Sequence, residues 1–152
     1  MKTLMIALVL ALASTSAIAG SIEAPGKVIY KMPNNEIVKR DVSLRIPARG
    51  QGDVVLVGQN ELVADRFFSK EVAGRTVFYV VFSGFPGATE GQKSVFRGTY
   101  LRGSNKAIYY GNVYIVDPQE MPDSEKDIHS MISSERNAKF AAGFKFAADI
   151  EQ

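Results

Sequence analysis

Apolar and polar residues alternate along most of the chain, and the clearest example spans residues 95–116. This stretch reads VFRGTYLRGSNKAIYYGNVYIV, two runs rich in Tyr, Phe, Val and Ile that join at Gly103, Ser104 and Asn105. Such residues fit a pleated, half-buried surface, and Gly, Ser and Asn tolerate the backbone angles of a tight turn. The pattern predicts an antiparallel β-hairpin at the centre of the fold.

Two glycines interrupt the arms of this hairpin. Gly98 and Gly111 lie at positions that a side chain fills in an ordinary strand. Glycine weakens a strand interior, so we expect each to mark a bulge, a bend or a place where an aromatic ring crosses the backbone.

The same period of two predicts strands before the hairpin. Residues 28–32 and 36–46 read as two strands with one apolar face each, and Arg40 is the exception on the apolar face of the second. We expect residues 53–58 to form a short buried strand. Residues 62–72 fit either a strand or a helical turn, and the hairpin-like residues that follow favour the strand.

Residues 75–83 (RTVFYVVFS) are apolar on both faces. A strand of this kind has to be covered on both sides, which places it in the middle of the core. Residues 84–94 follow as a long loop with one proline and three glycines. Loops of this length are either functional or merely mobile, and the sequence leaves both open.

A short helix is predicted after the hairpin. Asp123 can cap a helix that starts near Ser124, and Ile128, Met131 and Ile132 form an i, i+3, i+4 stripe that can dock on the sheet.

Residues 138–150 combine two signals. Their alanines are typical of a helix, but Phe and Ala recur at every second position, and this strict period favours a closing strand. The fold class expected is all-β: a single antiparallel β-sandwich or closed β-barrel of about eight strands, with one short α-helix before the last strand.

The first residues have the order of a secretory signal peptide. Lys2 is a minimal basic region, residues 4–13 are apolar but too short to span a bilayer, and Ala17-Ile18-Ala19 offers small residues to signal peptidase. We expect residues 1–19 to be cleaved, residues 20–152 to form a single β domain, and the product to be periplasmic or secreted.

Composition excludes several chemistries. The chain has no cysteine, so disulfides, zinc–thiolate sites, iron–sulfur clusters and thiol nucleophiles are impossible. Its formal net charge is +2, the acidic residues gather after residue 116, and no basic stripe is present. We therefore expect no nucleic-acid partner.

Motifs for catalysis or metal binding are also missing. His129 is the only histidine, no G-x-S-x-G motif accompanies it, and we expect it on the surface of the short helix. Asp123, Glu125 and Asp127 alternate as in a calcium loop, but the central glycine and the later glutamate are absent. No cofactor, no metal and no catalytic residue is predicted.

The remaining constellation is aromatic and basic. Tyrosine and arginine give large contact areas with directional hydrogen bonds, which suits a ligand-binding surface. The alternative is that the rings pack in the core and the guanidinium groups are solvated. The candidate ligand-binding residues are Arg97, Tyr100, Arg102, Tyr109, Tyr110 and Tyr114.

Three functions fit this sequence. The one it favours is an exported non-catalytic module that binds a partner protein, an envelope component or a small ligand. A second is a small eight-stranded outer-membrane β-barrel, the only one that implies a membrane, although Arg40 and the two-sided strand at residues 75–83 argue against it. The third is a hydrolase with convergent carboxylates, for which Glu61, Asp65, Glu71 and Glu90 are available. The sequence identifies neither the ligand nor the oligomeric state.

Overall fold

The computed structural model describes residues 21–31, 34–47, 53–84 and 91–149. The predicted signal peptide and most of the loop at residues 84–94 lie outside these ranges.

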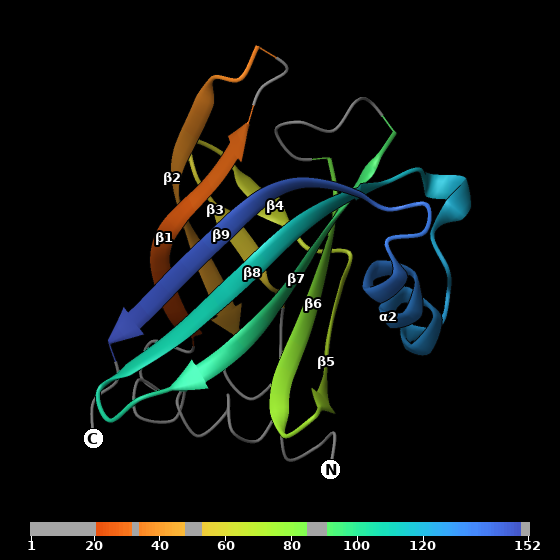
Figure 1. The fold of residues 1–152 in the computed structure, drawn as a ribbon. Coiled ribbons are helices and arrows are strands. Elements are labelled where there is room, and N and C mark those ends of the chain that lie inside the picture. Colours follow the sequence, from red (N-terminus) through yellow and green to blue (C-terminus); the bar gives the residue numbers. More distant parts are fainter. Residues whose placement is uncertain (1–20, 32–33, 48–52, 85–90, 150–152) are drawn as a thin grey trace.

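The described residues build one antiparallel sheet that curls into a half-barrel (Figure 1). Its strands run in the order β4-β3-β2-β1-β9-β8-β7-β6-β5, so β9 joins two groups of hairpin-linked strands. The strands are β1 (Ser21–Lys31), β2 (Ile37–Pro47), β3 (Val55–Val57), β4 (Glu61–Val63), β5 (Arg66–Val72), β6 (Arg75–Ser83), β7 (Lys93–Arg102), β8 (Lys106–Val116) and β9 (Lys139–Asp149).

The coarse prediction of an antiparallel all-β fold with one short helix before the last strand is confirmed. Neither the sandwich nor the closed barrel is confirmed. The described residues form nine strands rather than about eight, in part because residues 62–72 divide between β4 and β5. The amide of Ala64 donates to Val54 (2.8 Å) and that of Asp65 donates to Val81 (2.7 Å). The chain therefore crosses here from one edge of the curled sheet to the other.

The hairpin and the last strand follow the sequence pattern closely. β7 and β8 pair without a break from Lys93 opposite Val116 to Arg102 opposite Ala107. Of the residues 138–150 predicted as a strand, Lys139–Asp149 form β9, which confirms the strand over the helix. The first strand begins at Ser21, earlier than expected.

The glycines of the hairpin lie directly opposite each other. A Cβ on Gly98 would lie 2.6 Å from Cζ of Phe78 and 2.7 Å from Cζ of Phe144, and one on Gly111 would collide with the carbonyl of Arg97. The prediction that aromatic rings cross the backbone is thus confirmed at Gly98.

Helix α2 (Glu125–Ser134) covers one face of the sheet, on the side of β5 to β8 (Figure 1). Its predicted stripe, Ile128, Met131 and Ile132, is buried. The predicted cap was wrong. Ser124 caps the helix by accepting a hydrogen bond from the amide of Asp127 (3.1 Å), whereas the carbonyl of Asp123 accepts one from Arg66 (2.6 Å).

Two apolar layers lie on opposite faces of the sheet, and β6 contributes to both, as its two-sided pattern predicted. The inner layer, inside the curl, includes Phe78, Phe82, Phe96, Tyr100, Tyr109, Phe144 and Phe146. The outer layer, under α2, includes Phe68, Val77, Tyr79, Val81, Val95 and Tyr114.

Candidate functional site

The candidate residues predicted from the hairpin are divided between the two faces of the sheet. Tyr100 and Tyr109 face inward, are 5% and 3% exposed, and their ring centroids lie 5.0 Å apart. Their hydroxyls have no hydrogen-bond partner among the described residues. Burial raises the pKa of Tyr109, and burial raises that of Tyr100 to about 12 although the charge of Arg102 opposes the rise. Both phenols are therefore neutral core groups.

The other candidates do not join this pair on one surface. Tyr114 is buried under α2, as expected if the rings pack in the core, and Arg97 is half-buried on the same outer face. Tyr110 is half-buried and borders a shallow hollow on the outside of the sheet, and Arg102 is exposed at the end of the hairpin. As a ligand-binding set these six residues remain a prediction.

The structure reveals instead a polar cluster that the sequence did not specify. The hydroxyl of the fully buried Tyr79 accepts a hydrogen bond from Nε of Arg97 (3.1 Å) and is hydrogen-bonded to Nδ1 of His129. The ring of Tyr79 stacks on Phe68, with centroids 4.7 Å apart. His129 is thus half-buried against the sheet, which corrects the expectation of a surface residue.

Electrostatics favour a neutral histidine in this cluster. Partial burial lowers the pKa of His129, and the charges of Lys70 and Arg97 lower it further. Burial raises the pKa of Tyr79, although Arg97 opposes the rise. A neutral imidazole can accept a hydrogen bond from the phenol hydroxyl, so the cluster fastens α2 to β6 and β7. The sequence held one signal of this cluster. Tyr79 lies in a strand that is apolar on both faces, and a buried hydroxyl needs a hydrogen-bond partner.

The carboxylates considered for a hydrolase have separate partners. Glu61 pairs with Arg45 (3.4 Å), and Asp65 pairs with Lys93 (2.8 Å). Burial acts to raise the pKa of Asp65, but hydrogen bonds from Lys93 and Ser83 outweigh it and lower the pKa. Glu71 accepts from Thr76 (3.1 Å), and Glu90 lies outside the described residues. No group of three or more potential metal ligands occurs in the described ranges.

Besides the terminal strands β4 and β5, part of one edge of β2 is open in the described structure. This strand pairs with β1 over its full length, but β3 pairs only with Ser43, Leu44 and Arg45. Residues 37–42 therefore have no second strand neighbour within the described part of the chain. An edge of this kind presents unpaired backbone N–H and C=O groups to whatever approaches it.

Exposure along β2 reflects this difference. Leu44 and Ile46, on the inner face, are 1% and 3% exposed. On the same face Val42 is half-buried and Arg40 is exposed. The inner face of β2 is thus sealed at the end where β3 pairs and accessible at the other.

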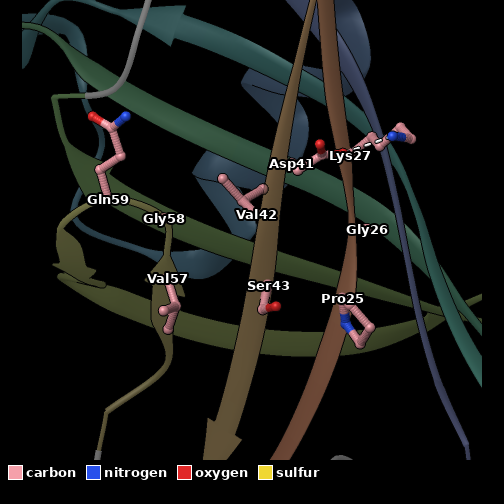
Figure 2. A pocket seen from close by; sticks show the side chains of 9 residues that line it. All are labelled: Pro25, Gly26, Lys27, Asp41, Val42, Ser43, Val57, Gly58 and Gln59. Atoms are coloured by element: carbon pink, nitrogen blue, oxygen red, sulfur yellow. Dashed lines mark hydrogen bonds and ion pairs between the residues drawn. The ribbon is translucent and has the colours of Figure 1, made fainter.

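Two hollows flank this edge, one on each face of the sheet. The outer hollow, of about 700 Å³, lies between β1, β2 and the β3–β4 turn, and Figure 2 shows its lining. Lys27 and Asp41, which lie opposite each other on β1 and β2, form an ion pair in its wall (2.6 Å). The inner hollow, of about 740 Å³, is lined in part by Arg40, Leu56 and Leu62. Asp41, Val42, Gly58 and Gln59 border both hollows.

Val42 and Gly58 mark the end of the open edge. The side chain of Val42 points toward Gly58 (Figure 2), and a Cβ on Gly58 would lie 3.3 Å from Cγ1 of Val42. Beyond this contact β3 no longer follows β2, because the chain turns through Gln59 and Asn60 into β4.

Arg40 lines the inner hollow together with the charged residues Lys39, Asp41 and Glu61, and it lies on the inner face of β2. Its Nε donates to the hydroxyl of Tyr30 (3.3 Å) on β1. None of the ion pairs formed among the described residues involves Arg40. The exception in the apolar pattern of residues 36–46 is therefore a guanidinium group beside an unpaired backbone edge.

Comparison of the chain with protein-family models, curated proteins and solved structures gives no match. Within the described residues, no helix has the length and apolar character needed to cross a membrane. A functional assignment therefore has to come from the geometry of the β2 edge.

Proposed function

We propose that this protein is an exported, non-catalytic binding module that takes up an extended segment of a partner protein as an additional strand along residues 37–42 of β2. The observation that supports this proposal is the unpaired edge of β2 with a hollow on each face. In strand addition, main-chain hydrogen bonds provide affinity, and side chains that alternate between the two faces provide specificity.

The dimensions of the site suit a strand. Six residues of unpaired edge are comparable to a typical strand of five or six residues. Side chains of an added strand would enter the outer and inner hollows in turn. Such a strand would also continue the half-barrel toward the closed barrel, one of the two architectures that the sequence predicted.

The inside of the half-barrel is less suited to a small ligand. Its aromatic rings pack against one another, with centroids 5.2 Å apart for Phe82 and Phe96 and 5.1 Å apart for Phe96 and Phe144. Small-molecule sites enclose most of the ligand surface, whereas the hollows beside β2 are open to solvent.

A second candidate function uses the inner hollow alone. Arg40, which is hydrogen-bonded to Tyr30, lines this hollow together with the apolar residues Val42, Leu56 and Leu62, and this combination suits a small amphipathic acid. Such a ligand needs no backbone contact with β2, so the two candidates differ in a measurable way.

The test uses N-methylated peptides, because N-methylation removes a backbone donor without changing the side chains. We would measure, by fluorescence anisotropy, the binding of a labelled ten-residue peptide of alternating Val and Thr, with one central Val replaced by Glu to face Arg40, to residues 20–152. Two variants carry N-methyl groups at the odd or the even positions. Every second amide of an added strand faces β2. We therefore expect one variant to lose binding and the other to keep it.

Equal binding of both methylated peptides would contradict strand addition, and so would no binding of the parent peptide. If the parent peptide does not bind, the protein should be tested with a fatty acid. Binding of the fatty acid that is lost in Arg40→Gln would favour the small amphipathic acid as the ligand.

A further inference from the structure

We infer that the strand taken up at this edge carries a carboxylate beside Arg40 and an apolar residue two positions away, beside Val42. This inference rests on the proposed strand addition and specifies the chemistry of the partner segment. It follows from the residues of β2 that alternate between the two faces of the sheet.

The inner face requires the carboxylate. Val38, Arg40 and Val42 share this face, so the inward side chains of an added strand lie beside them. A neighbouring strand would remove part of the water around Arg40, which has no acidic partner among the described residues. A partly desolvated charge without a counter-ion is costly, and a carboxylate can pair with guanidinium through two parallel hydrogen bonds.

The position beside Val42 requires an apolar side chain. Val42 and Leu62 are partly buried against the inner core, and Leu56 is 4% exposed. Together they form the apolar part of the inner hollow. A side chain that points inward there would contact hydrocarbon, and a polar one would lose its water without gaining a partner.

The outer face adds a weaker preference. Asp41 already pairs with Lys27 (2.6 Å), so it places little demand on a neighbouring strand. Ile37, which shares this face, is 55% exposed at the start of the edge. Selectivity is therefore concentrated on the inner face.

The same residues disfavour a second copy of this chain as the occupant. Two antiparallel β2 edges related by a two-fold axis place one residue opposite itself. Centring the pair on Lys39, Arg40 or Asp41 sets two like charges directly opposite, which destabilises the pairing. An inward-pointing charge on an edge strand protects against such self-association. Arg40 thus disfavours a second copy and favours an acidic strand.

The experiment compares three peptides that differ only at the central inward position, which is Glu, Gln or Lys in the alternating Val/Thr background. Dissociation constants are measured by anisotropy at low salt. With the unmodified protein we expect the Glu peptide to bind at least tenfold more tightly than the Gln peptide, and the Lys peptide to bind most weakly. In Arg40→Glu the order of the Glu and Lys peptides should reverse.

Lys39→Gln is the matched control, because it removes a neighbouring positive charge from the outer face. It should leave the ratio between Glu and Gln peptides unchanged. A circular dichroism melt checks that each variant is folded, which we expect because Arg40 and Lys39 are both exposed.

The outcomes separate the inference from the function on which it rests. Binding that is sensitive to N-methylation but equal for Glu and Gln would overturn the acidic partner and leave strand addition intact. If N-methylation does not change the binding of any peptide, both strand addition and the acidic partner are overturned. Sedimentation equilibrium that shows a dimer disrupted by Asp41→Lys would instead identify a second copy as the occupant and overturn the inference.

Discussion

Single residues that break a regular pattern carry much of the information in this chain. Arg40 interrupts an apolar face and lies beside an open edge. Tyr79 puts a hydroxyl into a strand that is apolar on both sides, and the hydroxyl is bound by Arg97 and His129. Tyr79 thus marks a polar group with specific partners, and Arg40 marks a charge without an acidic partner among the described residues.

The stability of the protein should depend on pH through His129. Its pKa is lowered in the folded state by partial burial and by the charges of Lys70 and Arg97, whereas in the unfolded chain it is near 6.5. The unfolded state therefore binds the proton more readily. The free energy of unfolding should fall as the pH decreases from above about 7 through 6.5 to the lower folded pKa.

Because His129 is the only histidine, the change in the free energy of unfolding around pH 6.5 should come mainly from this residue. Urea unfolding at several pH values measures the slope, and His129→Asn, which keeps an acceptor beside Tyr79, should flatten it. An unchanged slope in this variant would assign the pH dependence to other groups.

A second prediction concerns the hydroxyl of Tyr109, which is buried without a partner among the described residues. Tyr109→Phe removes this group and keeps the ring, so it should raise the free energy of unfolding by about 1 kcal/mol. Tyr110→Phe, on the half-buried outer face, is the control and should change it by less than about 0.5 kcal/mol. A loss of stability in Tyr109→Phe would show that the hydroxyl has a partner in solution.

At the level of elements, the sequence pattern was a good guide wherever burial alone decides the structure. The period of two identified the hairpin and β9, and the stripe at Ile128, Met131 and Ile132 identified the helix face. Alternation had already placed Arg97 and Tyr100 on opposite faces of one strand. What it could not indicate is that α2 covers one of these faces, since this depends on long-range packing.

The close approach of β7 and β8 at their paired glycines gives a further prediction. Gly98→Ala should lower the free energy of unfolding by about 1–3 kcal/mol, because the new methyl group would collide with the rings of Phe78 and Phe144 and with the carbonyl oxygen of Tyr110. Gly103→Ala, where the nearest atom to a new Cβ is the carbonyl of Lys106 at 3.6 Å, is the matched control. Thermal unfolding of both variants compares them, and equal losses would exclude crowding around the Gly98 Cβ as the cause.

At the scale of the whole molecule, the sheet is defined by where its strands stop. β3 pairs with only three residues of β2, and the chain then crosses to β5 at Ala64 and Asp65. Nothing in the alternation of residues 36–46 indicates that residues 37–42 lack a second neighbouring strand within the described part of the chain, because strand pairing is a non-local property. The candidate site was therefore beyond the reach of the sequence, except for the signal at Arg40.

Amide hydrogen exchange along β2, measured residue by residue by NMR in the free and the peptide-bound protein, tests the central claim most directly. We predict that the amides in residues 37–42 that face away from β1 exchange rapidly in the free protein. On addition of the Glu peptide they should become protected at every second residue, while Ser43, Leu44 and Arg45 change little. Peptide binding that leaves residues 37–42 unprotected would contradict the account.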